Sequence, residues 1–464
     1  MPRVKLFFLL FIVSFSVMAQ EDTLKVQVFD WNMESPEGWN VAYSGEANFP
    51  EAGQWRQILM VKTLKCDVRT KADTLACGEW DYLTRTNILI PKGDTVEAFN
   101  LSSFVTPYGK YLNLGGEKGW QWVIDVTDYA PILKGKRQII SGNNQELLDL
   151  KFYFISGVPT RNSLSVQNLY PYGRYKYKHI ADDSIMKSTS VILDKNAAGY
   201  KLRARISGHG HEGPHNCCEW DNKWHTYKIG DWEQFKWNVW KDCGFNPIYP
   251  QGGTWAFSRA GWCPGTEVDA HDFELTPLVH SGDTVQIDYE IEMYRNNGEE
   301  NGEFEMSHQL ISYSAPNFYN DVMLKDIIAP SGNQAYGRIN PICSNPIIRI
   351  QNTGKLPLKQ CMIYYGVNGV MDSLMWQGNL NFLEEQEIVL PEIDWEKAWL
   401  NPVFEVRLDK PNGLDDNQPL NNQLKSHITK PLVLPKNFIV HIKTNDLGRA
   451  LRNLSRRYGI QSCD

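Results

Sequence analysis

The chain contains 464 residues, with 47 Lys and Arg against 54 Asp and Glu, which gives a formal net charge of -7 at pH 7. A chain of this length is predicted to form about three domains of roughly 150 residues each. The acidic balance argues against nucleic acid as a partner, because a polyanion binds a basic surface. The 16 Trp and 21 Tyr are many for this length. Burial explains most of them, and a sugar-binding cleft is the more specific interpretation.

The N-terminus has the pattern of a secretory signal peptide, residues 1–19. Arg3 and Lys5 form a basic region, residues 6–17 are apolar but too few to span a bilayer, and Ala19 offers a small residue at the cleavage site. No long apolar stretch follows, so we predict a secreted or periplasmic protein without a membrane span. The nine cysteines are an odd number, and in an oxidising compartment they predict disulfides with at least one thiol left over.

Short runs of alternating apolar and polar residues recur along the chain and predict β-strands. They cover residues 24–29, 55–63, 84–90, 150–155 and 284–294. Turn-forming Gly, Pro, Asn and Asp separate them, and no amphipathic helix longer than about three turns precedes the C-terminal region. Many short strands in a secreted chain predict an all-β protein made of sandwiches or jelly rolls.

Two turn-rich segments are the expected domain boundaries, one near residues 170–173 and one near residues 329–332. They divide the chain after the signal peptide into four parts: domains at 20–173, 174–328 and 329–440, and a tail at 441–464. Strands at 347–352, 362–367 and 404–408 predict that the third domain is a small sandwich.

The third domain resembles bacterial immunoglobulin-like adhesion modules in two short motifs. One is the turn at residues 351–354, Gln-Asn-Thr-Gly, and the other is the pair Asn421-Asn422. This resemblance implies a spacer or an adhesion module rather than a catalytic domain. The tail carries no pattern that assigns it a role.

Two similar boxes place carboxylates beside a tryptophan and a cysteine. They are Cys77-Gly78-Glu79-Trp80-Asp81 and Cys217-Cys218-Glu219-Trp220-Asp221. A carboxylate can move a proton, and an indole ring can pack on the apolar face of a pyranose. Asp81 and Glu219 are therefore candidate acid/base residues in one site built from two domains. The alternative is that each is an ordinary surface carboxylate.

Histidines crowd into the stretch before the second box. The spacing of His209, His211 and His215, followed by Cys217 and Cys218, could ligate a transition metal. The alternative, which we prefer, is a loop held by hydrogen bonds and a disulfide. We therefore predict no metal site.

Six segments resemble the bacterial peptide-N-glycosidase F family in the same order along residues 29–313. They are Cys77-x-Glu79-Trp80-Asp81, Phe104-Val105-Thr106-Pro107-Tyr108, Ile124-Asp125-Val126-Thr127-Asp128, Ile206-Ser207-Gly208-x-Gly210-His211, Cys217-x-Glu219-Trp220 and Arg259-Ala260-Gly261-Trp262-Cys263-Pro264-Gly265. The resemblance implies two side-by-side antiparallel jelly-roll domains with the active site between them. It also implies hydrolysis of the amide bond between asparagine and the first N-acetylglucosamine of an N-glycan, which gives a glycosylamine and aspartate.

The resemblance assigns roles to individual residues. Asp81 matches the principal catalytic aspartate, and Glu219 matches an essential glutamate from the second domain. Trp80 and Arg259 match residues that line the cleft, and His211 matches a residue with no metal role, so these three are predicted to contact substrate. Arg259 could offer donors to sugar or amide oxygens, or hold Glu219 in place by a bidentate pair.

The same comparison implies two disulfides, Cys66 with Cys77 and Cys243 with Cys263. It leaves Cys218 as an extra cysteine beside Cys217, because the partner of the family's short bridge is Asp221 here. The role of the Cys217-Cys218 pair is open at this point.

The chain also departs from the family at four positions. A functional glutamate on a strand of the first domain aligns with Ile155, and a tryptophan shortly after it aligns with Gly157. An arginine after the catalytic aspartate is Tyr82 here, and a cleft tryptophan is His209. These departures point to a different set of sugar contacts.

We therefore predict a glycoamidase that acts on N-linked glycopeptides or glycoproteins without a cofactor, as a monomer. The alternative is a non-catalytic N-glycan-binding protein, which the departures at Ile155 and Gly157 favour. A remote third interpretation is a copper-dependent monooxygenase-like protein, because peptidylglycine monooxygenases have a similar fold. The sequence leaves open which glycans are accepted.

Overall fold

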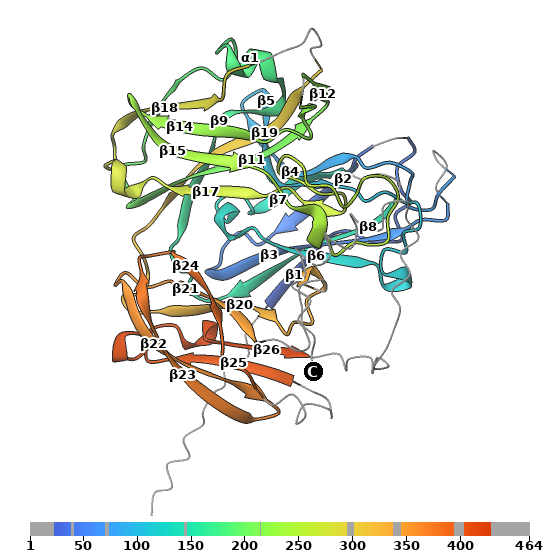
Figure 1. Ribbon diagram of the computed structural model, residues 1–464. Helices are drawn as coiled ribbons and strands as arrows, with labels where there is room; N and C mark the ends of the chain where they lie inside the picture. The colour runs from blue at the N-terminus through green and yellow to red at the C-terminus, as the bar shows by residue number, and fades with distance from the viewer. Residues whose placement is uncertain are drawn as a thin grey trace, which may run out of the picture.

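The computed structural model describes residues 23–38, 41–69, 74–142, 146–213, 215–294, 301–336, 345–393 and 403–427. The predicted signal peptide and the tail lie outside these ranges. The described chain is formed almost entirely by antiparallel β-strands (Figure 1), which confirms the all-β prediction. Within the described ranges no helix is long and apolar enough to cross a membrane.

The first sandwich packs a four-stranded sheet, in the order β1-β8-β3-β6, against a five-stranded sheet, β16-β5-β4-β7-β2. The bounds are β1 Thr23–Phe29, β2 Tyr43–Phe49, β3 Trp55–Cys66, β4 Leu83–Lys92, β5 Thr95–Val105, β6 Trp120–Asp125, β7 Gly135–Ser141, β8 Glu146–Ser156 and β16 Thr266–Glu267. Alternation decides which side chains enter its core. Phe152 and Phe154 of β8 are fully buried, whereas the intervening Tyr153 and the following Ile155 are not.

The second sandwich packs the sheet β10-β18-β14-β15 against the sheet β17-β11-β19-β9, and a short hairpin, β12-β13, extends from it. The bounds are β9 Ser163–Lys176, β10 Thr189–Ile192, β11 Gly199–His209, β12 His211–Glu212, β13 Cys217–Cys218, β14 Lys223–Ile229, β15 Trp232–Val239, β17 Ala270–Glu274, β18 Thr284–Ile291 and β19 Glu303–Tyr313. Its core is rich in buried aromatic rings, including Tyr227, Tyr289 and Phe304.

The third sandwich has its own core and lies below the other two in Figure 1. It packs the sheet β20-β21-β24 against β23-β22-β25-β26. The bounds are β20 Val322–Ala329, β21 Ile347–Asn352, β22 Leu358–Val367, β23 Val370–Leu380, β24 Glu385–Val389, β25 Val403–Asp409 and β26 Gln423–His427.

Helical structure is limited to short segments between strands. These are α1 Tyr177–Ala181 and the 3-10 turns η1 Gly116–Lys118, η2 Thr127–Tyr129, η3 Cys243–Phe245, η4 Thr276–Leu278, η5 Gln334–Tyr336, η7 Pro411–Gly413 and η8 Pro419–Asn421.

One expected boundary segment lies within a strand, and the other begins at the last residue of a strand. Residues 170–173 lie inside β9, which pairs with β19 of the second sandwich. Ala329 is the last residue of β20, which pairs with β21 in the third sandwich. We therefore propose that the domains divide just before β9 and just before β20, because a strand hydrogen-bonded into a sheet belongs to that sheet.

The first two sandwiches are joined by a strand and by buried charges. β16 comes from the second half of the chain but pairs with β5 of the first sandwich. Asp128, in η2, accepts hydrogen bonds from Lys201 Nζ at 2.7 Å and Arg203 Nη2 at 2.8 Å, both on β11. Burial alone would raise the pKa of Asp128, but attraction to Lys201 and Arg203 outweighs it and holds that pKa well below the usual range.

Substitution of Asp128 tests the strength of this junction. We expect Asp128→Ala to destabilise the protein by about 3 kcal/mol, because it leaves the buried Arg203 with less compensation for its charge. Asp94→Ala, in the exposed β4–β5 turn, should change stability by less than about 0.5 kcal/mol. Urea unfolding followed by tryptophan fluorescence measures both. Equal effects of the two variants would contradict a role for the network.

Candidate active site

Asp81 lies between a disulfide and the start of β4. Cys77, four residues earlier, is bonded to Cys66 at the end of β3, and this is one of the two bridges that the resemblance implies. Immediately after Asp81, the backbone of Tyr82 exchanges hydrogen bonds with Thr106, which provides its hydroxyl and its amide at 2.9 Å each. The Asp81 backbone is therefore fixed on both sides.

Glu219 is positioned in a similar way by the second sandwich. It follows Cys217 and Cys218, which form a disulfide between adjacent residues of β13 and are both buried. Its amide donates to the carbonyl oxygen of Gly210 at 3.3 Å, and its carbonyl oxygen accepts from the amide of Ala260 at 3.0 Å. The two cysteines thus belong to the loop that holds Glu219.

The buried side chain of Arg259 connects Glu219 to the loop that carries the arginine. Arg259 is 0% exposed, and its Nε donates to Glu219 Oε1 at 3.1 Å. Nη1 donates to the carbonyl oxygen of Phe257 at 2.7 Å, and Nη2 donates to Thr254 Oγ1 at 2.8 Å. All three nitrogens have partners and none reaches solvent, so the guanidinium positions Glu219. Only one nitrogen contacts the carboxylate, so the pair is not bidentate.

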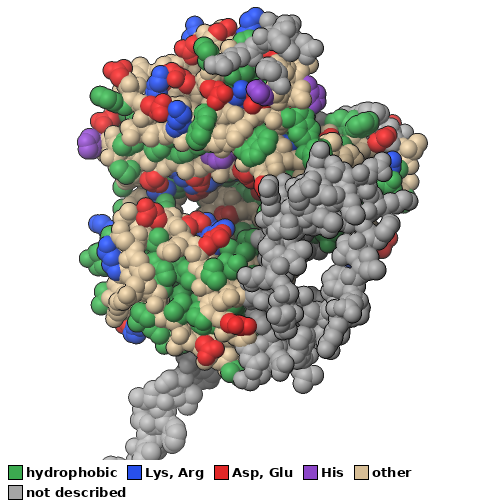
Figure 2. Space-filling view, in the orientation of Figure 1, with side chains coloured by type: hydrophobic (Ala, Val, Ile, Leu, Met, Phe, Trp, Pro, Cys, Tyr) green, Lys and Arg blue, Asp and Glu red, His purple; other side chains and the backbone are tan. Residues whose placement is uncertain are grey.

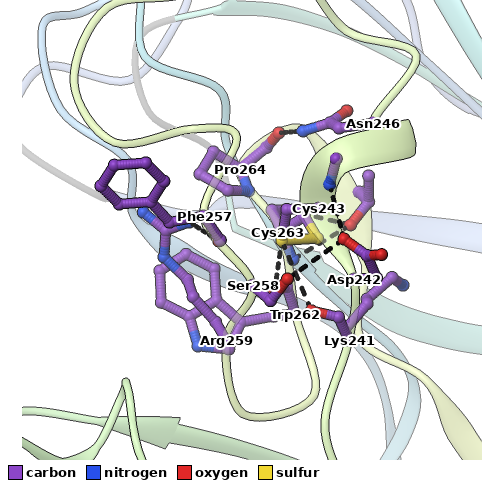
Figure 3. Close-up of a disulfide and its surroundings, with 12 residues drawn as sticks. Lys241, Asp242, Cys243, Asn246, Phe257, Ser258, Arg259, Trp262, Cys263 and Pro264 are labelled. Atoms are coloured by element: carbon purple, nitrogen blue, oxygen red, sulfur yellow. Dashed lines mark hydrogen bonds between the residues drawn. A yellow bond between two sulfur atoms is a disulfide. The ribbon is translucent and has the colours of Figure 1, made fainter. Parts of the chain in front are cut away.

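Aromatic rings enclose the two faces of this guanidinium. Its central carbon lies 4.3 Å from the ring centroid of Trp220 and 4.8 Å from that of Trp262. Such contacts stabilise a cation that has been removed from water. Figure 3 shows Arg259 between Phe257 and Trp262, on the loop that runs toward the Cys243–Cys263 disulfide.

The Cys243–Cys263 disulfide, the second bridge that the resemblance implies, ties both ends of this loop together. Next to it, the backbones of Lys241 and Arg259 form an antiparallel bridge, with hydrogen bonds of 2.8 and 3.1 Å. Together they fix the backbone from which the Arg259 side chain extends.

The pKa of Asp81 depends on burial and on the nearby charges of Arg259 and Glu219. Burial raises the pKa of the Asp81 carboxyl to about 6, with the charge of Arg259 acting to lower it and the charge of Glu219 acting to raise it. Tyr108 also donates a side-chain hydrogen bond to Asp81, and burial together with the Asp81 charge raises the pKa of Tyr108 to about 12. The tyrosine therefore stays a hydrogen-bond donor.

Tyr108 is a site residue to which sequence reasoning assigned no role, although it ends one of the six matched segments. The loop that carries Arg259 packs closely on its ring. Gly253 has φ +61°, and a Cβ atom there would lie 2.8 Å from the Tyr108 ring. Both the left-handed backbone and the close approach require glycine.

The chain is similar to known proteins in both sequence and structure. Residues 176–311 match the sequence model described as Peptide-N-glycosidase F, C terminal. The chain is 28% identical over 309 residues to peptide-N(4)-(N-acetyl-beta-D-glucosaminyl)asparagine amidase F of Elizabethkingia miricola, which covers 60% of this chain and 80% of that relative. This chain is similar to peptide-N-glycosidase F in sequence and in fold.

Solved structures of this family have the same fold. A structure of recombinant peptide N-glycanase F is 25% identical and superposes with a TM-score of 0.54, over 63% of this chain and 96% of that one. The structure of a glycosylasparaginase from Flavobacterium meningosepticum is 24% identical with the same TM-score and the same coverage. The family sequence model ends at residue 311, before β20 and the third sandwich begin.

Two further predicted site residues lie at the surface beside this candidate site. Trp80, next to Asp81, is 52% exposed. His211 is exposed, its Nε2 lies 3.9 Å from Glu219 Oε2, and its ring stacks on Trp220 with 13° between the planes. Both side chains are exposed, in contrast to that of Arg259.

The structure separates the three histidines of the suspected metal cluster. His209 is partly buried, its ring stacks on Trp262, and its Nε2 lies 2.9 Å from Ser207 Oγ. Burial lowers the pKa of His209 to about 3, so it is neutral. His211 and His215 are exposed. In the described ranges no group of three or more His, Cys, Asp or Glu side chains is arranged to hold a metal ion.

Ile155, which aligns with the family's strand glutamate, pairs at the opposite end of β3 from the disulfide that anchors the Asp81 loop. Ile155 pairs with Gln57 at the start of β3, whereas Cys66, which anchors the Asp81 loop, is at the other end of that strand. The two ends are roughly 30 Å apart at ~3.3 Å per residue. Ile155 and the following Gly157 therefore lie far from the Asp81 box, and they give no support to a loss of activity.

The raised pKa of Asp81 predicts how the site titrates. Carbon-13 NMR of labelled aspartate should show the Asp81 carboxyl titrating near pH 6, above the ordinary value of about 3.9. Glu219→Gln removes a negative neighbour and should lower this pKa, whereas Arg259→Gln removes a positive neighbour and should raise it. Titration at the ordinary value, or shifts in the opposite directions, would contradict a shared site.

The position of Ile155 predicts that it has no influence on substrate binding. We expect Ile155→Glu to leave KM for N-glycopeptides unchanged and to change stability by less than about 0.5 kcal/mol, because the side chain is half-buried on the outer face of β8. Steady-state kinetics and thermal unfolding of this variant check both points, and a lower KM would restore the original alignment.

Proposed function

We propose that this protein is a glycoamidase that hydrolyses the amide bond between asparagine and N-acetylglucosamine in N-linked glycopeptides or glycoproteins. One observation carries the proposal: Asp81 from the first sandwich and Glu219 from the second interact at one site around Arg259. Comparison with the amidase of Elizabethkingia miricola, named for this reaction, supports the same conclusion.

In the proposed reaction Asp81 is the general base. Its ionised carboxylate accepts a proton from a water molecule, the water oxygen attacks the carbonyl carbon of the asparagine side chain, and the carbon–nitrogen bond breaks. The proton is then transferred to the leaving nitrogen, which gives a glycosylamine and leaves aspartate in the peptide. A pKa near 6 makes Asp81 a stronger base than an ordinary aspartate while it remains ionised at neutral pH.

The other residues of the site have binding and positioning roles. The Glu219 carboxylate, held by Arg259, accepts a hydrogen bond from an amide or hydroxyl group of the first sugar. The accessible rings of Trp80 and His211 provide faces on which sugar rings pack. Arg259 acts through Glu219 and is a positioning residue. The chemistry is complete with water and carboxylates, so we propose no cofactor.

The alternative function is glycan binding without catalysis. It loses the support of Ile155 and Gly157, which lie away from the site, but Tyr82 and His209 remain departures from the family. Incubation with an N-glycopeptide separates the two functions, because only the amidase converts the glycosylated asparagine to aspartate. We also propose secretion or periplasmic export, which the pattern of residues 1–19 supports.

Replacement of the proposed base tests the mechanism. We expect Asp81→Asn to lower kcat by roughly 10²- to 10⁴-fold, because an amide of the same shape cannot accept the proton, while binding of the glycopeptide is retained. Mass spectrometry of the peptide product measures turnover, and calorimetry measures binding.

A matched control comes from the second box. Asp221 pairs with Lys223 Nζ at 2.7 Å, so Asp221→Asn should keep most of the activity. Near-normal turnover in Asp81→Asn would exclude Asp81 as the base. No turnover in the unmodified protein, with binding intact, would favour the glycan-binding function.

A further inference from the structure

A turn at residues 109–112 exposes a tyrosine close to the Asp81 box. The turn is closed by a hydrogen bond from the amide of Leu112 to the carbonyl oxygen of Gly109 at 3.1 Å. Tyr111, the third residue of the turn, is 71% exposed. Because most of its ring lies outside the protein, packing of the core does not account for an aromatic residue at this position.

The backbone of Tyr111 has a conformation that a tyrosine rarely adopts. Its φ angle is +68°, in the left-handed region. Glycine or asparagine usually takes this conformation at the third position of a turn, because a Cβ atom is crowded there. A bulky residue held in it is an outlier, and such outliers gather at ligand-binding and active sites. The strained backbone and the exposed ring together indicate a side chain that is kept for contact with a ligand.

The turn packs tightly on the first box. A Cβ atom at Gly109 would lie 1.7 Å from the carbonyl oxygen of Gly78, so the two backbones are in direct contact. Tyr108, directly before the turn, is buried and donates a side-chain hydrogen bond to Asp81. Tyr111 therefore extends from a segment that touches the Asp81 box at two points.

The loop that carries Arg259 also holds the turn. The amide of Tyr108 donates to Gln251 Oε1 at 2.9 Å. Gln251 is itself buried, and its Nε2 donates to two backbone carbonyl oxygens of its own loop region, at 2.7 and 3.0 Å. A Cβ atom at Gly252 would lie 2.9 Å from the Cβ atom of Lys110, the second residue of the turn. The exposed ring of the turn therefore stands on a fixed base.

The position of the turn decides which part of the substrate can meet this ring. In the proposed reaction Asp81 acts on the asparagine side of the bond that is cleaved, and Glu219 contacts the first sugar. The turn contacts the Asp81 box through Gly78 and Tyr108, whereas Glu219 is held by the second box and Arg259. The ring of Tyr111 therefore belongs to the peptide side of the site.

We propose that Tyr111 is a specificity-determining residue that packs on the polypeptide flanking the glycosylated asparagine. This inference rests on the proposed glycoamidase function and names the part of the substrate that the turn recognises. A phenol ring offers a large contact area and loses little conformational entropy on binding. It packs on apolar side chains and on peptide planes without demanding one sequence. Lys110 Nζ lies 5.4 Å from the centroid of the same ring and helps to keep it in place.

Two substrates with the same glycan test the proposal. One is a glycosylated asparagine blocked at both ends, and the other is a longer peptide with this asparagine at its centre. We expect Tyr111→Gly to raise KM for the longer peptide roughly three- to ten-fold, the loss of one aromatic contact, and to have little effect on the blocked asparagine. Tyr111→Phe, which keeps the ring, should restore the lower KM.

Stability separates recognition of the peptide from a structural role. Tyr111→Gly should leave the thermal midpoint unchanged or raise it, because glycine accepts the left-handed backbone without strain. Lys410→Gly is the matched control, since Lys410 is an exposed residue of the third sandwich with φ +49°. It relieves similar strain away from the site and should change neither KM value. A lower midpoint in Tyr111→Gly, with equal losses for both substrates, would overturn the proposal.

Calorimetry in the Asp81→Asn background separates this inference from the reaction itself. Tyr111→Gly should weaken binding of the longer glycopeptide and leave binding of the free glycan unchanged, whether or not the unmodified protein turns the substrate over. Weaker binding of the free glycan, or unchanged binding of the longer glycopeptide, would overturn the role of Tyr111. Absence of turnover in the unmodified protein, with the difference in binding intact, would count against the glycoamidase reaction alone.

Discussion

The complete burial of the Arg259 guanidinium is the constraint on which the site depends. A cation removed from water is tolerated only when its donors and its charge are both matched. Here Glu219 supplies the opposite charge, Phe257 and Thr254 accept the remaining hydrogen bonds, and Trp220 and Trp262 cover its faces. The requirements of one side chain thereby fix where Glu219 points and how the loop that packs on Tyr108 is folded.

At the junction between the first two sandwiches, buried cations are likewise matched by carboxylates. A site built from two domains works only if the domains keep their relative position to within a fraction of an ångström. Asp128 meets Lys201 and Arg203 across the junction, and Arg85 Nη2 meets Glu305 Oε2 at 2.8 Å. β16 adds backbone pairing to β5. Acidic and basic side chains are mixed over the visible face in Figure 2. Contacts between individual charged groups at the junction, rather than attraction between two oppositely charged surfaces, therefore hold the domains together.

Sequence reasoning predicted the fold class well and the surroundings of the candidate site less well, for physical reasons. Strand alternation and turn residues are local signals, so the all-β fold could be predicted. The boxes around Asp81 and Glu219 were recognisable because catalysis restricts residue type as well as position. The place of Ile155 could not be predicted, because a repetitive apolar strand carries no marker of its register. The complete burial of Arg259 could not be predicted either, because it depends on two tryptophans that pack on the side chain. Pro and Gly within β9 resemble a linker, so the sequence does not show that residues 170–173 are part of a strand.

Two pairs of carboxyl groups in this chain show opposite solutions to the same electrostatic problem. Burial raises the pKa of Asp81, the charge of Arg259 lowers it and the charge of Glu219 raises it, so Asp81 keeps a raised pKa and remains basic. Asp321 and Asp416 form no ion pair with an arginine among the described residues, and burial together with contact with Asp416 raises the pKa of Asp321 to about 8. A permanent cation built into the chain suits a site that must exchange protons with a substrate. A pair without one can stay in contact only while a proton lies between its two members.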